Sequence, residues 1–89
     1  MTSEQLRAAR ALLRWEQKDL ASASGVSLPS IKRIETRHGE IKSFESTLAS
    51  LRSALESAGI EFLDDGQASA RGGAGVRLRA GASGTDSEE

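Results

Sequence analysis

The feature that most constrains the fold is the GVSLP run at residues 25–29, which interrupts two short helical patterns. Glycine tolerates a left-handed backbone, so Gly25 can end the first helix and let the chain turn sharply. Ser27, followed closely by Pro29, is typical of a helix start, because a hydroxyl caps free amides and proline needs no donor in the first turn. A second helix is therefore predicted to begin near Leu28.

Both helical patterns divide into an inner and an outer side. Glu16 and Asp19 favour a helix that starts near Trp15, because exposed amides in a first turn attract acidic side chains. After the break, Ile31 and Ile34 stand three residues apart and so share an inward face. The outer face is left to Leu28, Pro29, Ser30, Lys32 and Arg33. Its two adjacent cations favour contact with DNA.

Residues 17–35 resemble the helix-turn-helix of the phage-repressor-like family (Cro/C1-type, also called XRE). The matching positions are Gln17, Leu20, Ala21, Gly25, Val26, Ser27, Ile31, Ile34 and Glu35. The resemblance covers about residues 3–58. It implies a mainly α, four-to-five-helix Cro/C1-type domain. It also implies a sequence-specific transcriptional regulator that places its second motif helix in the major groove of a twofold-symmetric operator in double-stranded DNA.

The resemblance also assigns roles to residues. Base contacts fall to Ser27, Leu28, Pro29, Ser30, Lys32 and Arg33. Arg33 is the best candidate for specificity, because arginine can grip guanine through two hydrogen bonds. Relatives often carry glutamines early in this helix, and Leu28 with Pro29 departs from that pattern. Whether these two read bases or only fit the groove stays open.

Two further roles follow from the resemblance. Gln17 matches a glutamine that donates to a DNA phosphate, and Lys18 is placed with it among the phosphate contacts. Arg10 and Glu35 match an ion pair that fixes the angle between helices. The alternative is that both charges are solvated, in which case they contribute little.

The flanking helices follow from periodicity. A first helix is expected over residues 3–13, with Ser3 as its cap and an inward stripe of Leu6, Ala9 and Leu13. Trp15 is predicted to fill the junction with the next helix; stacking on DNA is the less favoured reading. A fourth helix is expected from Lys42 or Ser43 to Gly59. Its stripe of Phe44, Leu48, Leu51 and Leu55 would close the core, or in part meet a second subunit.

The segment after Glu35 is predicted to be a polar loop in which Gly39 ends the recognition helix. Arg37, His38 and Lys42 could flank the groove and contact phosphates. A solvated loop accounts for them equally well, because Lys and Arg are common in any exposed loop.

The chain is expected to divide into a helix-turn-helix domain (residues 1–59), a β element (60–80) and a disordered acidic tail (81–89). Alternation predicts two short antiparallel strands whose apolar residues are Ile60, Phe62, Val76 and Leu78. An isolated hairpin is marginal in water, so it must pack on the fourth helix or pair across a twofold axis. Pairing in a homodimer is favoured, because exposed edges readily join other strands.

Composition narrows the function classes. Net charge is −1, but residues 1–42 hold eight Lys or Arg against five acids, and residues 43–89 hold four against eight. The basic half contains the proposed reading helix. With no cysteine and a single histidine, neither an enzyme, a metal site nor a cofactor is expected, and no small-molecule ligand is inferred. Without a membrane span or signal peptide pattern, the protein is expected to be cytoplasmic.

Two other functions remain open. An antitoxin-type interaction protein would bind its own promoter and also sequester a protein partner through its tail. A domain could also keep this fold and lose DNA binding, although Lys32 and Arg33 on the outer face speak against it.

Overall fold

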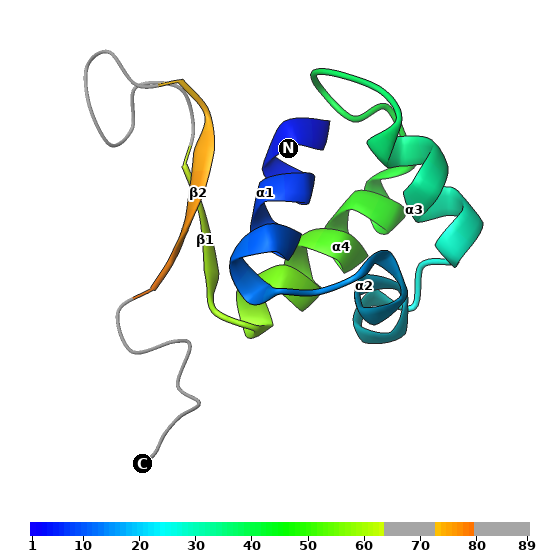
Figure 1. Cartoon of the computed structure of the whole chain (residues 1–89). Helices are drawn as coiled ribbons and strands as arrows, with labels where there is room; N and C mark the ends of the chain where they lie inside the picture. The colour runs from blue at the N-terminus through cyan, green and yellow to red at the C-terminus, as the bar shows by residue number, and fades with distance from the viewer. Residues whose placement is uncertain (64–72, 80–89) are drawn as a thin grey trace.

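The computed structural model of the chain describes residues 1–63 and 73–79. It confirms a mainly helical domain that ends in two antiparallel strands. The elements are α1 (Ser3–Leu13), α2 (Gln17–Ser24), α3 (Leu28–Glu35), α4 (Glu45–Ser57), β1 (Ile60–Leu63) and β2 (Gly75–Leu78). The strands and α3 lie at opposite ends of the molecule, with α1 and α4 between them (Figure 1). The predicted disordered tail lies outside the described residues.

Helix α1 has the expected bounds but a different cap. The Thr2 hydroxyl accepts from the Gln5 amide at 3.0 Å, and the Gln5 side chain accepts from the Thr2 amide at 2.9 Å. This reciprocal pair is a capping box. Ser3, the predicted cap, is 1% exposed, and its hydroxyl donates to the Ile34 carbonyl at 3.2 Å. The prediction for Ser3 is wrong because its side chain is used by a helix distant in sequence.

The break between α2 and α3 forms as predicted. Gly25 ends α2 with φ +77°, and the Ser27 hydroxyl accepts from the Ser30 amide at the start of α3. Helix α2 begins at Gln17, two residues after the predicted start, because the Asp19 carboxylate accepts from the Glu16 amide and makes Glu16 the cap.

Helix α3 is shorter than predicted. It ends at Glu35, four residues before Gly39. The prediction that Gly39 ends the helix is therefore wrong; this glycine, with φ +80°, instead turns the loop after the helix. The chain after Glu35 leaves helical geometry because its backbone is hydrogen-bonded to the start of α1. The Ser3 amide donates to the Gly39 carbonyl at 2.9 Å.

Helix α4 packs through part of its predicted stripe. Leu51 and Leu55 are fully buried, and Leu48 packs against the core. Phe44 is 81% exposed, so its assignment to the core is wrong. It is the cap residue, with extended φ −62° and ψ 146°, and therefore does not share the helical periodicity that turns the leucines inward. Gly59 follows the helix with φ +108°.

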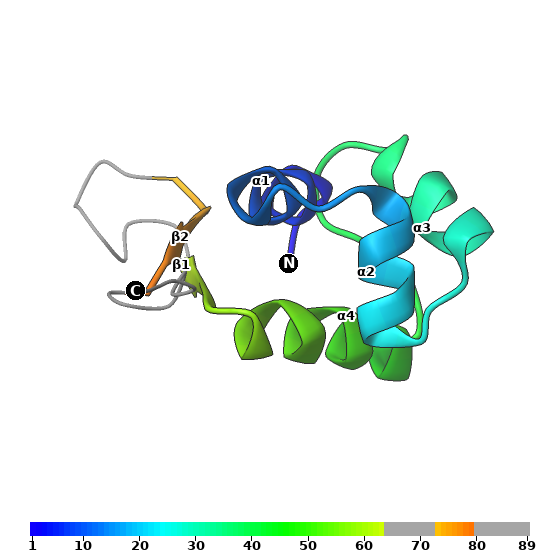
Figure 2. The same cartoon turned by 60° about the horizontal axis from the view of Figure 1, so that its bottom comes forward.

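The hairpin packs on its own chain. Residue Ile60 pairs with Leu78 and Phe62 with Val76, so these four side chains share one face of the sheet. That face lies against α1 and α4 (Figure 2). Gln5 fastens one end, where its Nε2 donates to the carbonyl oxygens of residues 63 and 75 at 3.2 and 2.9 Å.

One core joins the helices and the hairpin. Its buried apolar members are Leu6, Ala9, Leu20, Ile31, Ile34, Ile41, Leu51, Leu55, Ile60 and Phe62. Leu13 and Trp15 are partly buried and pack against it, as expected. Within the described ranges, no helix combines the length and apolar character needed to cross a membrane.

Candidate nucleic-acid interface

Helix α3 presents opposite faces to the core and to solvent. Ile31 and Ile34 are 0% and 8% exposed, whereas Lys32 and Arg33 are both exposed. The Arg33 guanidinium makes one long hydrogen bond, 3.4 Å, to the Ser30 hydroxyl. The outer face of α3 is therefore open and carries two cations that no acidic group of the described residues pairs.

The other predicted base-contact residues lie at the start of α3. Ser27 and Pro29 are exposed, and Leu28 and Ser30 are half-buried. The Ser27 and Ser30 hydroxyls are hydrogen-bonded to each other at 2.9 Å. The first turn of α3 thus offers a small, mostly uncharged surface, and the charge lies one turn further along.

Arg10 and Glu35 form a fork of two hydrogen bonds. Arg10 Nε donates to Glu35 Oε2 and Nη2 to Oε1, each at 2.7 Å. Their side chains are 19% and 5% exposed, so the pair is largely removed from water. The hydrogen bonds to the carboxylate raise the pKa of Arg10, and desolvation opposes part of that rise.

The same carboxylate also holds α2. Gln17 Nε2 donates to Glu35 Oε1 at 3.0 Å, so one acidic group joins side chains of α1, α2 and α3. A side-chain amide has two N–H groups, and Glu35 uses one of them. Gln17 therefore keeps a donor for a further acceptor, in an orientation fixed by the buried pair.

Four of the predicted contact residues surround one hollow of about 600 Å³. Arg33 comes from α3, while Arg37, His38 and Lys42 come from the loop at residues 36–44. All four are exposed. The acid on this wall, Glu40, lies 2.7 Å from the amino-terminal nitrogen. We call this feature the basic hollow; its excess of basic over acidic side chains suits an anionic group.

Lys18 is set apart from the basic hollow. It lies on α2, and its ammonium is 3.5 Å from the Glu16 carboxylate. Both side chains are more than two-thirds exposed, so this pair holds Lys18 weakly.

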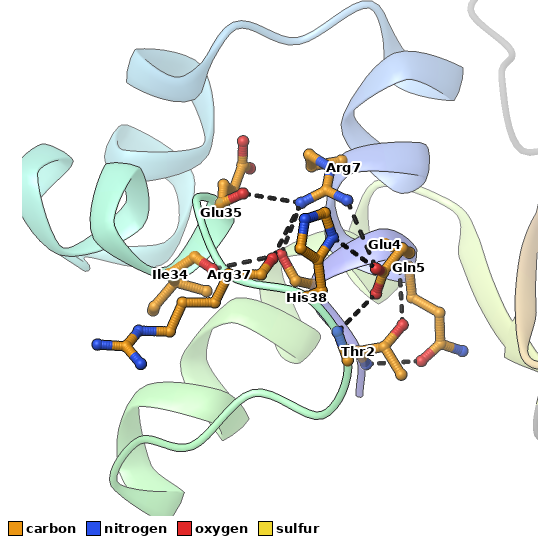
Figure 3. A network of polar contacts seen from close by, with 10 residues as sticks. Thr2, Glu4, Gln5, Arg7, Ile34, Glu35, Arg37 and His38 are labelled. Carbon is orange, nitrogen blue, oxygen red and sulfur yellow. Dashed lines mark hydrogen bonds and ion pairs between the residues drawn. The ribbon is translucent and has the colours of Figure 1, made fainter.

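Glu4 and Arg7 were not singled out by the sequence, and both reach the chain after α3 (Figure 3). The backbone amide of Glu4 and that of Gly39 donate hydrogen bonds to the Glu4 carboxylate, which lowers its pKa. The spacing of residues 3, 4 and 7 places them along one side of α1. That spacing was visible in the sequence, but their partners more than 25 residues away were not.

Comparison with known proteins does not assign the chain to a family. Neither the models of known protein families nor the curated proteins include a match to it. Its resemblance to phage-repressor-like regulators thus stays a prediction made from the residues.

Proposed function

We propose that this protein is a sequence-specific DNA-binding transcriptional regulator of the phage-repressor-like kind. Helix α3 would enter the major groove of double-stranded DNA. The observation that carries the proposal is the exposed pair Lys32 and Arg33 on a helix whose opposite face is buried and whose last residue, Glu35, is held by Arg10. Base sequence is read by side chains that a well-held helix presents to the base edges in the major groove, and α3 presents exposed hydrogen-bond donors opposite its buried face.

The proposed DNA contacts fall into base contacts and phosphate contacts. Arg33 is proposed to bind guanine through two parallel hydrogen bonds, which discriminate by about 1–3 kcal/mol. Lys32 and the first turn of α3 would fill the rest of the groove. Gln17 would donate its free N–H to a phosphate, and Arg37 and Lys42 of the basic hollow would neutralise the neighbouring backbone.

Selection of bound duplexes from a random DNA pool tests the proposal. A recovered sequence motif is the expected result, and recovery of random sequences would refute sequence-specific binding. On a recovered duplex at fixed salt, Arg33→Ala should weaken specific binding by about 10-fold or more and non-specific binding far less. Gln17→Ala should weaken both alike. Arg14→Ala, which removes an exposed cation from outside α3, is the matched control.

We propose further that the DNA-bound form is a homodimer joined by hairpin edges. The Ile60 and Phe62 side chains, which the sequence assigned to dimerisation, are buried in their own chain, so that assignment is corrected. The Arg79 amide donates to the Gly59 carbonyl at 2.8 Å. Because bonded pairs alternate along an antiparallel ladder, the backbone groups of Val76 and Leu78 point to the outer edge. Such an edge can pair with a second copy.

Sedimentation over a range of concentrations tests this dimer. Val76→Pro removes an outward N–H without removing a bond of the hairpin itself, so it should shift the full chain towards monomer. Persistence of an unchanged dimer in a folded Val76→Pro variant would exclude the β2 edge. A recovered DNA motif with twofold symmetry would support a dimer independently.

A further inference from the structure

A polar network fastens the start of α1 to the end of α3 (Figure 3). Arg7 Nη1 donates to the Glu35 carbonyl at 2.7 Å and to the Arg37 carbonyl at 3.4 Å. It also donates to the Ser3 hydroxyl at 2.8 Å, which in turn donates to the Ile34 carbonyl. The last carbonyl groups of a helix lack partners within that helix. Side chains of α1 therefore supply partners that the end of α3 needs.

Glu4 holds the next part of the same loop. Its Oε1 accepts from the Gly39 amide at 3.0 Å, and its Oε2 lies 3.3 Å from His38 Nδ1. Gly39 has φ +80°, a conformation that sharply redirects the chain and that few residues other than glycine adopt. Glu4 thus fixes the loop at the residue where it turns.

These contacts adjoin the basic hollow, because Ser3 and Gly39 line it. Neither Glu4 nor Arg7 lines it, yet three of its four basic residues belong to the loop that they hold. Long exposed side chains lose conformational entropy when they gather on one anion, and a fixed backbone reduces that cost. The loop backbone at residues 37 and 39 is fixed mainly from α1.

We propose that Glu4 and Arg7 are positioning residues for phosphate binding: they hold the loop so that Arg37 and Lys42, which line the basic hollow, reach a phosphodiester of the DNA strand beside the base that Arg33 contacts. The inference rests on the proposed function and adds to it two residues that influence DNA binding without touching DNA. It assigns an acidic residue, Glu4, a role in favour of binding a polyanion.

Because Glu4 is acidic, the direction in which its removal changes DNA affinity tests the inference. Deleting a negative charge near a DNA surface should, by charge alone, strengthen binding. The positioning role gives the opposite result: Glu4→Ala should bind a mixed-sequence duplex about 5-fold more weakly at low salt, because the loop cations lose their alignment. Glu45→Ala is the matched control, since Glu45 is an exposed acid in the first turn of α4. That control should bind equally or more tightly.

A conservative variant separates anchoring from charge. In Glu4→Gln the amide oxygen can still accept from the Gly39 amide, so most of the lost affinity should return. The Gly39 amide should exchange its hydrogen faster in Glu4→Ala than in Glu4→Gln or the unchanged protein. Melting temperatures of all variants are compared, so that general unfolding is recognised.

Arg7 is tested against another arginine of the same helix. Arg7→Gln and Arg14→Gln each remove one positive charge, and Arg14 is exposed. Arg7→Gln should weaken binding by about 10-fold and Arg14→Gln by about 2-fold, if only Arg7 positions the loop. Equal losses would overturn the inference for Arg7, as would tighter binding by folded Glu4→Ala for Glu4. If the unchanged protein binds no duplex, the proposed function fails, and this inference with it.

Discussion

Two bidentate Arg–Glu ion pairs, one at each end of the molecule, have similar hydrogen-bond geometry but differ in solvent exposure. Arg10 and Glu35 join three helices beside the proposed DNA surface, and their side chains are 19% and 5% exposed. Arg77 and Glu61 join β2 to β1, and their side chains are 57% and 39% exposed. A solvent-exposed ion pair contributes little to stability, whereas removing one partner of a buried pair leaves an unpaired charge in the protein interior. Burial, more than bond geometry, therefore decides which fork the fold depends on.

The difference extends to how each end is held. At the α3 end, polar side chains fix the elements that carry exposed cations. At the hairpin end, apolar burial holds the strands: Phe62 is 6% exposed, with the Arg52 guanidinium 4.8 Å from its ring centre. Buried polar contacts therefore hold the charged surface at the α3 end in place, whereas the hairpin end closes the core through apolar side chains.

Removing one member of the buried Arg10–Glu35 pair should have the largest effect on stability. Arg10→Met should lower the free energy of unfolding by about 3 kcal/mol, because Glu35 would keep only the Gln17 donor in a buried position. Urea denaturation measures the loss. The double variant Arg10→Met with Glu35→Met should be less destabilised than Arg10→Met alone. A loss no larger than that of Arg77→Met would refute the role of burial.

Removal of the hairpin clamp should have the next largest effect. Gln5→Ala deletes two hydrogen bonds to strand carbonyls and the one that the Gln5 side chain accepts from the Thr2 amide, which should cost about 2 kcal/mol. Hydrogen exchange should then quicken first at the strand amides. If exchange instead quickened equally in α2 and α3, the clamp would not be specific to the hairpin.

A smaller effect of opposite sign is expected between α1 and α2. Arg14 has φ +58° and ψ +36°, the left-handed region that glycine adopts without steric cost. Arg14→Gly should raise the free energy of unfolding by about 0.5–1 kcal/mol. Arg14→Ala, which keeps the Cβ atom, is the control and should bring no such gain. A lower melting temperature for the glycine variant would contradict the expected strain.

The exposed ion pair of Arg77 and Glu61 should affect only the pH dependence of stability. Hydrogen bonds from Arg77 hold the pKa of Glu61 below its ordinary value of 4.5. Its contribution is therefore fully present above pH 4.5 and is lost as the pH falls through the lowered pKa. The stability gap between the unchanged protein and Glu61→Gln should close on acidification and shrink in high salt. A gap that widened below pH 4.5 would reverse the assigned sign.

The sequence predicted α2, α3 and the turn between them well because the signals there are local. Gly25, Ser27 and Pro29 act within a few residues of chain, and the burial of Ile31 and Ile34 follows from helical spacing. The same reasoning failed at Ser3, Gly39 and Phe44, where a distant partner or a cap conformation overrides periodicity.

The positions of the helices and strands, and the outward face of α3, follow from the order of the residues along the chain. The partners of the polar groups follow from the packing of distant segments: Arg7 meets the end of α3, Glu4 meets Gly39, and Gln5 meets the strands. Periodicity and capping depend on neighbours along the chain, whereas these pairings depend on how the packed core brings residues 28 to 70 positions apart within hydrogen-bonding distance. The shape of the basic hollow belongs to this second kind of information.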